Sequence, residues 1–436
     1  MNLKKHARLI VNAAINSVHP ENLIRDCIQF DGQILKINSR KFNLDEFRSV
    51  SIIGAGKASA AMAFSLQQRI GDKLSTGFII TNYGNKIDCG KIEVVEAGHP
   101  ISDANSLAAT EKLLNLVQRL SESDLVICLI SGGASALMES PLAGFTLTDI
   151  QNLNSCLLAC GANIEEINIL RKRFSKVKGG KLAAHIYPAQ MINLVVSDVI
   201  NDPLPIIGSG PLSPDYSTFK DAWNVVEKYD LQDEIPVSMS RYLQQGLTKM
   251  DTEMRSTDNR IFSRVFSFIL GNNERARRAA IKHARVLCYK TIEIADPVQG
   301  EAREAAKKMV QFIRNQNFKQ PTAIIWGGET TVRLRKKGKG GRNQEFVLAA
   351  LAEMEDRSDS PFVLLSCGTD GRDGPTDAAG AMINEISYLN AINLQLDPKH
   401  FLDEHDSYTF FSLTDGLVKT GSTGTNVMDI GLYLGK

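Results

Sequence analysis

Short apolar runs alternate with helical patterns along most of this 436-residue chain. Runs of this length, separated by helices such as the one expected over residues 104–120, are typical of β-α-β units and a largely parallel sheet. The fold class predicted is therefore α/β. The expected strands are residues 49–56, 76–81, 92–98, 124–133 and 191–198 in the first half and 267–272, 322–329, 361–371 and 409–416 in the second.

A polar stretch without apolar periodicity, residues 247–261, interrupts this rhythm. We therefore expect two domains, 1–250 and 260–436, as the chain length also favours. The first twenty residues contain no acid, and their apolar residues recur at helical spacing. They predict an amphipathic first helix rather than a targeting sequence.

The charge balance excludes partners that need a strong overall field. Lysine plus arginine (50) nearly equals aspartate plus glutamate (49), so we expect no nucleic-acid and no membrane partner. The seven cysteines form no C-x-x-C pair, which favours a reducing cytoplasm and argues against a zinc site. No apolar run approaches the roughly 18 residues of a membrane span. A homodimer is compatible with these expectations.

The first glycine-rich turn, "GAGKASAAMA", places Lys57 between an expected strand and a helix of small residues, after Gly54 and Gly56. In α/β sheets ligands collect beyond the carboxyl ends of strands, and a helix N-terminus with a nearby lysine suits an anion. The turn is not a phosphate loop, and Ser59 replaces the third glycine of a dinucleotide fingerprint. A tight turn with an exposed lysine is the competing interpretation.

The second turn, "LISGGASALMESP", follows another expected strand. Gly132 and Gly133 allow the backbone to approach a ligand closely, and Ser131 and Ser135 can donate to phosphate oxygens. A packing role for the glycines is the alternative.

The third turn begins "SDVINDP" and contains Asp198. An aspartate at a strand end can accept a proton from a hydroxyl or hold a hydrated magnesium ion, although surface aspartates in turns are common.

In the second half, "GGETTV" contains Glu329 and Thr330, and "GGRNQEF" contains Arg342, whose planar fork suits a carboxylate or a phosphate. The stretch "SCGTDGRDGPTDAAGA" adds Asp370, Asp373 and Asp377. These three carboxylates are candidate Mg²⁺ ligands, with an ordinary aspartate-glycine turn as the competing interpretation.

Taken together, the motifs of the chain resemble those of the glycerate 2-kinases that combine an N-terminal Rossmann-like domain with a C-terminal α/β MOFRL domain. The resemblance covers nearly the whole chain, with the MOFRL region at about residues 320–430. It rests on "GAGKASAAMA", "EAGHPISDAN", "LISGGASALMESP", "KVKGGKLA", "SDVINDPLPIIGSGPLSPD", "GGETTV", "GGRNQEF", "GTDGRDGPTDAAGA" and "TGSTGTNVMDIGLYL", in this order.

The resemblance implies ATP-dependent phosphorylation of the 2-hydroxyl of D-glycerate, with Mg²⁺, at an active site in the interdomain cleft. It implies essential roles for Lys57 on the phosphates, Asp198 on the 2-hydroxyl, and Arg342 on the glycerate carboxylate or the transferred group. The remaining expected ligands of substrate, nucleotide or metal are Gly54, Gly56, Ser131, Gly132, Gly133, Ser135, Glu329, Thr330, Asn343, Gly368 and Asp370, with Asp373 and Asp377 for the metal.

The chain departs from the family pattern at Ala134, where another glycine is expected, and this change could weaken nucleotide binding. His99 and residues 420–426 match family motifs without a role that we can derive. Two other functions stay open. One is an NAD(P)-dependent hydroxypyruvate reductase, which the missing third glycine disfavours, and the other is a sugar-phosphate binding module without catalytic activity.

Overall fold

A computed structural model describes residues 2–248, 258–354 and 361–435. The chain forms two compact units. One unit comprises Leu23–Leu270, and the other combines Met1–Asn22 with Gly271–Lys436. The polar stretch at residues 249–257 lies outside the described residues.

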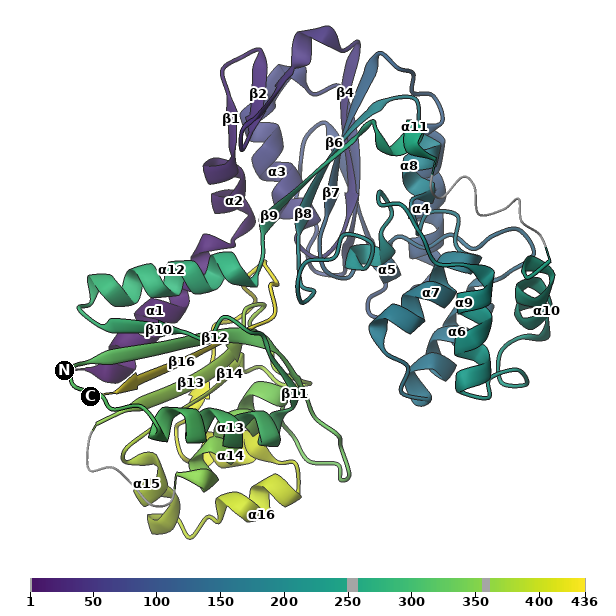
Figure 1. The fold of residues 1–436 in the computed structure, drawn as a ribbon. Helices are drawn as coiled ribbons and strands as arrows, with labels where there is room; N and C mark the ends of the chain where they lie inside the picture. Colours follow the sequence, from purple (N-terminus) through teal and green to yellow (C-terminus); the bar gives the residue numbers. More distant parts are fainter. Residues whose placement is uncertain (1, 249–257, 355–360, 436) are drawn as a thin grey trace. The chain divides into compact units, whose positions relative to one another are not determined.

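The Leu23–Leu270 unit is built on a six-stranded sheet in the order β6-β5-β4-β7-β8-β9 (Figure 1). Every pair from β6 to β8 is parallel, as the sequence predicts. The strands are β4 (Ser49–Ala55), β5 (Thr76–Asn82), β6 (Ile92–Ala97), β7 (Asp124–Ile130), β8 (Gln190–Val196) and β9 (Val265–Gly271). A three-stranded antiparallel sheet precedes them: β1 (Ile28–Phe30), β2 (Ile34–Ile37) and β3 (Arg40–Asn43).

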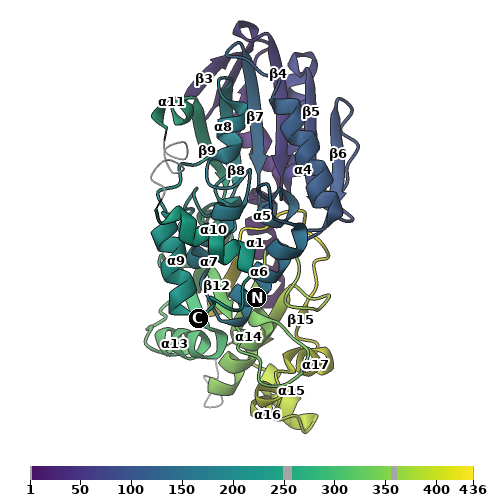
Figure 2. The same ribbon diagram turned by 90° about the vertical axis from the view of Figure 1, so that its right-hand side faces the viewer.

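Helices cover both faces of this parallel sheet. Helices α4 and α8 pack on the face that presents Ile53, Phe78 and Val126, and α3 lies against the other face (Figure 1). Helices α6, α7, α9 and α10 form a separate apolar cluster around Phe174 (Figure 2). The helices of this part are α2 (Pro20–Cys27), α3 (Ser59–Ile70), α4 (Ala104–Val117), α5 (Ala134–Leu137), α6 (Leu147–Ala159), α7 (Ile164–Phe174), α8 (Lys181–Ile186), α9 (Phe219–Lys228), α10 (Val237–Gly246) and α11 (Asn259–Phe262).

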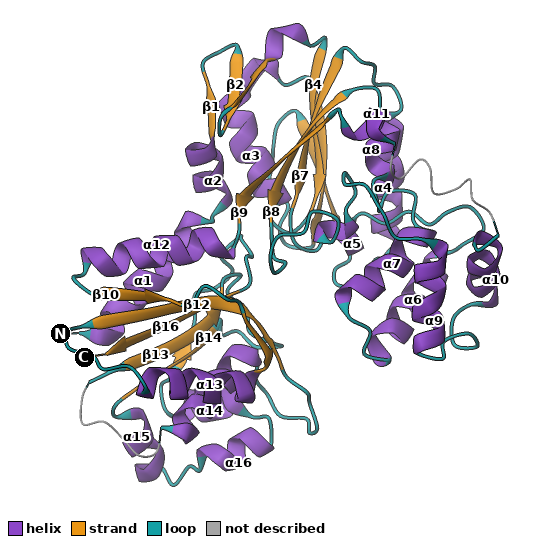
Figure 3. Cartoon of the chain, viewed as in Figure 1, coloured by secondary structure: helices purple, strands orange, loops and turns teal. Residues whose placement is uncertain are grey.

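The second unit contains a mixed sheet in the order β10-β12-β16-β13-β14-β15, with β11 also pairing with β12 (Figure 3). Strands β10 and β11 run parallel to β12, whereas the other pairs are antiparallel. The strands are β10 (Lys290–Glu293), β11 (Val298–Glu301), β12 (Thr322–Thr331), β13 (Val363–Gly368), β14 (Gly380–Asn384), β15 (Leu417–Val418) and β16 (Asp429–Gly435).

Two pairs of helices cover opposite faces of the mixed sheet: α1 with α12, and α13 with α14 (Figure 1). Helix α1 is the amphipathic helix that the first twenty residues predict, and it buries Ala7, Ile10, Val11, Ala14 and Ile15. The helices are α1 (Leu3–Ser17), α12 (Asn273–Val286), α13 (Ala302–Arg314), α14 (Arg342–Glu353), α15 (Ser387–Asn393), α16 (Pro398–Asp403) and α17 (Ser407–Leu413).

The observed units differ from the expected domains in two places. Helix α1 belongs to the unit of the C-terminal half, and residues 260–270, which include most of β9, complete the parallel sheet of the first unit. Periodicity along the chain identifies such elements but does not reveal which sheet they join.

The strand expected over residues 409–416 is wrong, because helix α17 covers Ser407–Leu413. Its buried residues are Ser407, Phe410 and Phe411. The spacing i, i+3, i+4 places them on one face of a helix, and a short apolar run of this kind does not distinguish helix from strand.

Candidate active site

The turns singled out in the first half of the sequence lie at one edge of the parallel sheet. Strands β4, β7 and β8 are in register up to Ala55, Ile130 and Val195, so their carboxyl ends are level. Lys57 follows β4, Gly132 and Gly133 follow β7, and Asp198 follows β8. This is the edge where open α/β sheets bind ligands.

Backbone and hydroxyl contacts join the loops of Lys57 and Gly132. The Lys57 N–H donates to the Gly132 carbonyl at 2.9 Å, and the Ala58 N–H donates to Ser131 Oγ at 3.0 Å. Gly56 has a φ of +138°, and a Cβ there would lie 2.1 Å from Ser131 Oγ. Ser131 is buried, so its hydroxyl holds the two loops together rather than facing solvent as an expected phosphate donor would.

Three side chains from different strand ends converge on this glycine pair. A Cβ on Gly133, whose φ is +87°, would lie 2.8 Å from His99 Cδ2 and 3.5 Å from Lys57 Cγ. A Cβ on Gly132 would lie 2.0 Å from Asp198 Oδ2. Only residues without a side chain fit between these groups. The structure thus brings together Lys57, Asp198 and His99.

Lys57 is the group of this cluster that suits an anionic ligand. Burial first, and then the charge of Lys57, lower the pKa of His99 to about 4, so its imidazole is neutral at pH 7. Among the described residues the Lys57 ammonium group makes no hydrogen bond or ion pair. A half-buried lysine beside glycine-rich loops can neutralise a phosphate.

Two other residues expected here have structural contacts. Ser135 Oγ donates to Ser209 Oγ at 2.7 Å, and Ser209 in turn donates to Asn168 Oδ1. This chain of hydroxyls ties the second turn to the "GSGP" turn. A Cβ on Gly54 would lie 2.1 Å from the Leu129 carbonyl oxygen, so Gly54 allows β4 and β7 to pair closely.

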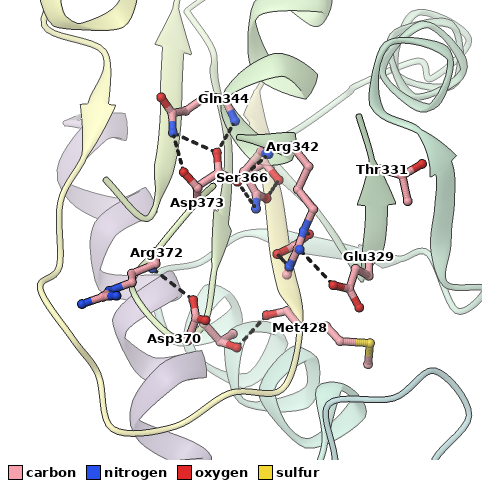
Figure 4. Close-up of polar contacts among 12 residues, drawn as sticks. Glu329, Thr331, Arg342, Gln344, Ser366, Asp370, Arg372, Asp373 and Met428 are labelled. Carbon is pink, nitrogen blue, oxygen red and sulfur yellow. Dashed lines mark hydrogen bonds and ion pairs between the residues drawn. The ribbon is translucent and has the colours of Figure 1, made fainter. Parts of the chain in front are cut away.

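In the other unit, Arg342 is the first residue of α14 and is surrounded by carboxylates (Figure 4). Its Nε donates to Asp429 Oδ2 at 2.6 Å and its Nη2 to Asp429 Oδ1 at 2.9 Å. Its Nη1 lies 2.9 Å from Glu329 Oε1. Burial, the largest single cause, lowers the pKa of Arg342, but the hydrogen bonds with Asp429 and the charges of Asp429 and Glu329 together raise it above its ordinary value.

The three aspartates expected to bind a metal together do not form one site. Asp373 is buried and caps α14, where its Oδ1 and Oδ2 accept from the N–H groups of Asn343 at 3.0 Å and Gln344 at 2.8 Å (Figure 4). Asp377 accepts from Lys419 at 2.8 Å and Tyr408 at 2.7 Å. In the described part of the chain, no group of three acidic, histidine or cysteine side chains is placed to hold a metal ion. The sequence shows that these aspartates share a loop, but it does not show what each one faces.

Asp370 differs from these two aspartates. Its Oδ1 accepts from the Arg372 N–H at 3.0 Å (Figure 4). A Cβ on Gly368 would lie 3.1 Å from Asp370 Oδ1 and 3.6 Å from Asp429 Oδ1. Two carboxylates therefore flank Gly368, close to Arg342.

Two of the remaining expected ligands in this unit are buried. Asn343 accepts from Ser366 Oγ at 2.6 Å and donates to Asp373 at 3.3 Å, so its side chain belongs to the support of α14. Thr330, on β12, is 8% exposed.

Some functional candidates had no role in our sequence interpretation. Asp429, which binds Arg342 through both oxygens, lies in the quoted motif "NVMDIGLYL" as an acid at the start of an apolar run. The basic stretch 171–183 contains buried ion pairs: Lys178 lies 2.5 Å from Glu139, and Lys172 and Arg173 bind Asp215. The spacing of charged residues alone does not distinguish these buried pairs from a solvated helix face.

Comparison with known proteins places the chain in a family. Residues 6–244 match the family described as a domain of unknown function (DUF4147), and residues 322–429 match the MOFRL family. The D-glycerate 2-kinase of Thermotoga maritima is 38% identical over 98% of this chain and 97% of its own length. The chain belongs to the glycerate 2-kinase family.

A solved structure and a differently named relative extend this comparison. The crystal structure of glycerate kinase from Thermotoga maritima has a TM-score of 0.85 and 36% identity, covering 100% of this chain and 99% of the other. A protein of Agrobacterium vitis, provisionally named a hydroxypyruvate reductase, is 39% identical over 87% of this chain and 97% of its own length.

Ala134, which stands where the family pattern has another glycine, is buried and is the first residue of α5. It has helical backbone geometry that alanine adopts readily.

None of the helices among the described residues is long and apolar enough to cross a membrane.

Proposed function

We propose that this chain is a glycerate 2-kinase that transfers the γ-phosphoryl group of ATP to the 2-hydroxyl of D-glycerate and releases ADP. Membership of the glycerate 2-kinase family supports this reaction. The single structural observation that carries it is the convergence of Lys57, His99 and Asp198 on the glycine pair at the carboxyl ends of parallel strands. Phosphoryl transfer depends mainly on charge neutralisation and alignment, and these residues can supply both.

Lys57 binds the phosphates in this proposal. Its ammonium group makes no hydrogen bond or ion pair among the described residues, and the neutral imidazole of His99 beside it adds no second charge. The N–H groups and small residues of the glycine turn allow a phosphate to approach closely. The cation then offsets the charge that the transferred group carries in the transition state.

Asp198 orients the 2-hydroxyl of glycerate and accepts its proton. It follows β8 and lies against Gly132, beside the loop of Lys57. When the hydroxyl oxygen bonds to the γ-phosphorus, the bond from that phosphorus to the β,γ-bridging oxygen breaks. The hydroxyl proton moves to the carboxylate, and ADP leaves.

Arg342 binds the glycerate carboxylate or the transferred phosphoryl group. Its ion pairs raise its pKa, so it stays a cation throughout the reaction. The proposal requires that Arg342 and Lys57 act on the same bound substrates during turnover. The expected cleft between the domains stays a prediction.

Binding of Mg²⁺ needs fewer protein carboxylates than the three aspartates that the sequence suggested. Magnesium commonly takes one or two protein carboxylates and completes its shell with water and phosphate oxygens. Asp370 would hold it, because Asp373 is committed to capping α14 and Asp377 to Lys419. When bound, the ion neutralises phosphate charge.

An enzyme-coupled assay tests the reaction. The protein is incubated with D-glycerate, ATP and MgCl₂, and the product is detected with enolase, which accepts 2-phosphoglycerate directly. A signal with enolase alone supports the proposal. A signal that needs added phosphoglycerate mutase would establish 3-phosphoglycerate and overturn the proposed regiochemistry.

The relative from Agrobacterium vitis makes a reductase the second candidate. The same preparation is therefore given hydroxypyruvate and NADH or NADPH without ATP. Robust oxidation of the reduced nucleotide, together with no ADP formation in the first assay, would overturn the kinase proposal. ADP formation with no oxidation of NADH or NADPH would support the kinase over the reductase.

A further inference from the structure

Arg342 is held on one edge by the carboxylate of Asp429, which takes no direct part in the proposed reaction. A guanidinium group has five N–H donors in a fixed plane. Asp429 takes the edge formed by Nε and Nη2, with contacts of 2.6 and 2.9 Å. The side-on pair leaves N–H donors on Nη1 and Nη2, which form the end of the guanidinium plane, and Glu329 Oε1 lies 2.9 Å from Nη1.

The two carboxylates on Arg342 differ in how firmly they are held. Asp429 begins β16 in the middle of the mixed sheet and is in register with both Gly328 and Gly368. Its carbonyl accepts from Asn273 Nδ2 at 2.8 Å, and its side chain is 9% exposed. The side chain of Glu329 is 41% exposed. Asp429 is therefore the fixed partner of Arg342, and Glu329 is the solvated one.

We propose that Asp429 is a positioning residue that fixes the Arg342 guanidinium by one edge and presents its Nη1/Nη2 end to the anionic substrate group. This inference rests on the proposed function, in which Arg342 binds glycerate or the phosphoryl group. A charge-assisted pair with two contacts sets the plane of a guanidinium as well as its distance. The ion pair with the half-exposed Glu329 is more accessible to solvent, so a substrate anion can replace it.

Fixing the Arg342 side chain matters because an arginine at a helix N-terminus can adopt several conformations. Arg342 lies at the first turn of α14, and a long side chain at that position has several rotamers. Misplacing a reacting or binding group by about 1 Å can lower the rate about a hundredfold. Asp429 removes that freedom before a substrate arrives.

A double-mutant cycle tests whether Asp429 acts through Arg342. We expect Asp429→Asn to lower kcat/KM for D-glycerate phosphorylation by about tenfold to a hundredfold. In the Arg342→Lys background, which has no planar fork to orient, the same change should lower kcat/KM by less than about threefold. An undiminished loss in that background, or no loss in the wild-type background, would overturn the proposal.

A second buried ion pair of α14 provides the matched control for stability. Glu345 binds Arg303 at 2.7 Å and lies 3.1 Å from His405 Nδ1. Glu345→Gln should lower the melting temperature and leave kcat/KM within about threefold of wild type. If Glu345→Gln lowered kcat/KM as much as Asp429→Asn at a similar melting temperature, loss of stability would explain the effect and the proposal would fail.

Arginine side-chain NMR separates this inference from the proposed function, because it needs no substrate. The Nε–H signal of Arg342, assigned by its absence in Arg342→Lys, should exchange slowly with water in the wild-type protein and rapidly in Asp429→Asn. Rapid exchange in the wild-type protein would contradict the fixed edge. An inactive wild-type protein with a slowly exchanging Nε–H would contradict the kinase reaction while retaining the anchoring by Asp429.

Discussion

The lysine of the parallel sheet and the arginine of the mixed sheet are held in different ways. Lys57 sits in a turn organised by backbone hydrogen bonds and glycines, and its ammonium group has no partner among the described residues. Arg342 is bound by two carboxylates before any ligand is present. The first cation is available to a ligand at once, whereas the second is oriented by the protein itself.

This difference predicts different consequences of mutation. Substitutions around Lys57 should change the reaction with little effect on stability, because few native contacts depend on that side chain. Substitutions around Arg342 should change stability as well, because its partner Asp429 is a nearly buried carboxylate at the start of a central strand of the sheet.

The largest expected effect is that of Lys57→Ala. We expect kcat to fall about a hundredfold to a thousandfold, since a preorganised charge on the transferred group is lost. The melting temperature should stay close to that of the wild type. Steady-state kinetics and a thermal melt check both statements.

Lys112→Ala is the matched control, because Lys112 is exposed and pairs with Glu93 at the surface. It should leave kcat unchanged. A large loss of melting temperature in Lys57→Ala, in proportion to its loss of activity, would show that Lys57 is structural and would remove the contrast with Arg342.

A smaller effect is expected for Asp370→Asn. The Mg²⁺ concentration for half-maximal activity should rise by about tenfold, because one anionic ligand is lost. Asp377→Asn, on the same loop, should leave this concentration unchanged, since Asp377 is engaged by Lys419 and Tyr408. Mg²⁺ titration of the initial rates measures both variants. Equal shifts would contradict the proposal that Asp370, and not Asp377, binds Mg²⁺.

Asp373→Ala should act on stability. The carboxylate caps the N-terminus of α14 through the N–H groups of Asn343 and Gln344, and loss of such a cap costs about 1–2 kcal/mol. The free energy of unfolding, measured in urea, should fall by this amount. Asp373→Asn keeps one acceptor oxygen and should lose less. Unchanged stability in Asp373→Ala would contradict the capping role.

Much of the parallel sheet could be predicted from the sequence, because each of its strands is a short apolar run that ends on a glycine-rich or polar turn. The same rule predicted that Lys57 and Asp198 lie at one edge, since parallel strands end level with each other. Reading a short apolar run as a strand failed for residues 409–416, where two adjacent phenylalanines belong to helix α17.

The mixed sheet and its site were less predictable. Antiparallel pairing brings Asp429 beside Gly368 and Gly328 from distant parts of the chain, and no local pattern encodes that pairing. The aspartate loop shows the same limit: residues four apart in sequence, Asp373 and Asp377, have a helix N-terminus and a surface lysine as partners. Composition identified the carboxylates, but only tertiary contacts separate the cap from the candidate ligand.

The smallest expected effect concerns His99, which tests the electrostatics of the Lys57 region. In the folded protein burial, and then the charge of Lys57, lower the pKa of His99 from 6.5 to about 4. Between these two values the unfolded chain binds a proton that the folded chain does not. The stability of the folded state must therefore fall as the pH decreases from 6.5 to 4.

His99→Asn removes this titration, so we expect the variant to lose less stability than the wild type over the same pH range. Urea unfolding at pH 7.5, 6.5, 5.5 and 4.5 measures the difference, which should be constant above pH 6.5 and change below it. Lys57→Ala should weaken the wild-type pH dependence, because removing the nearby cation raises the pKa of His99 toward its ordinary value. A difference between wild type and His99→Asn that is the same at every pH would mean that burial and the charge of Lys57 do not hold His99 neutral in the folded protein.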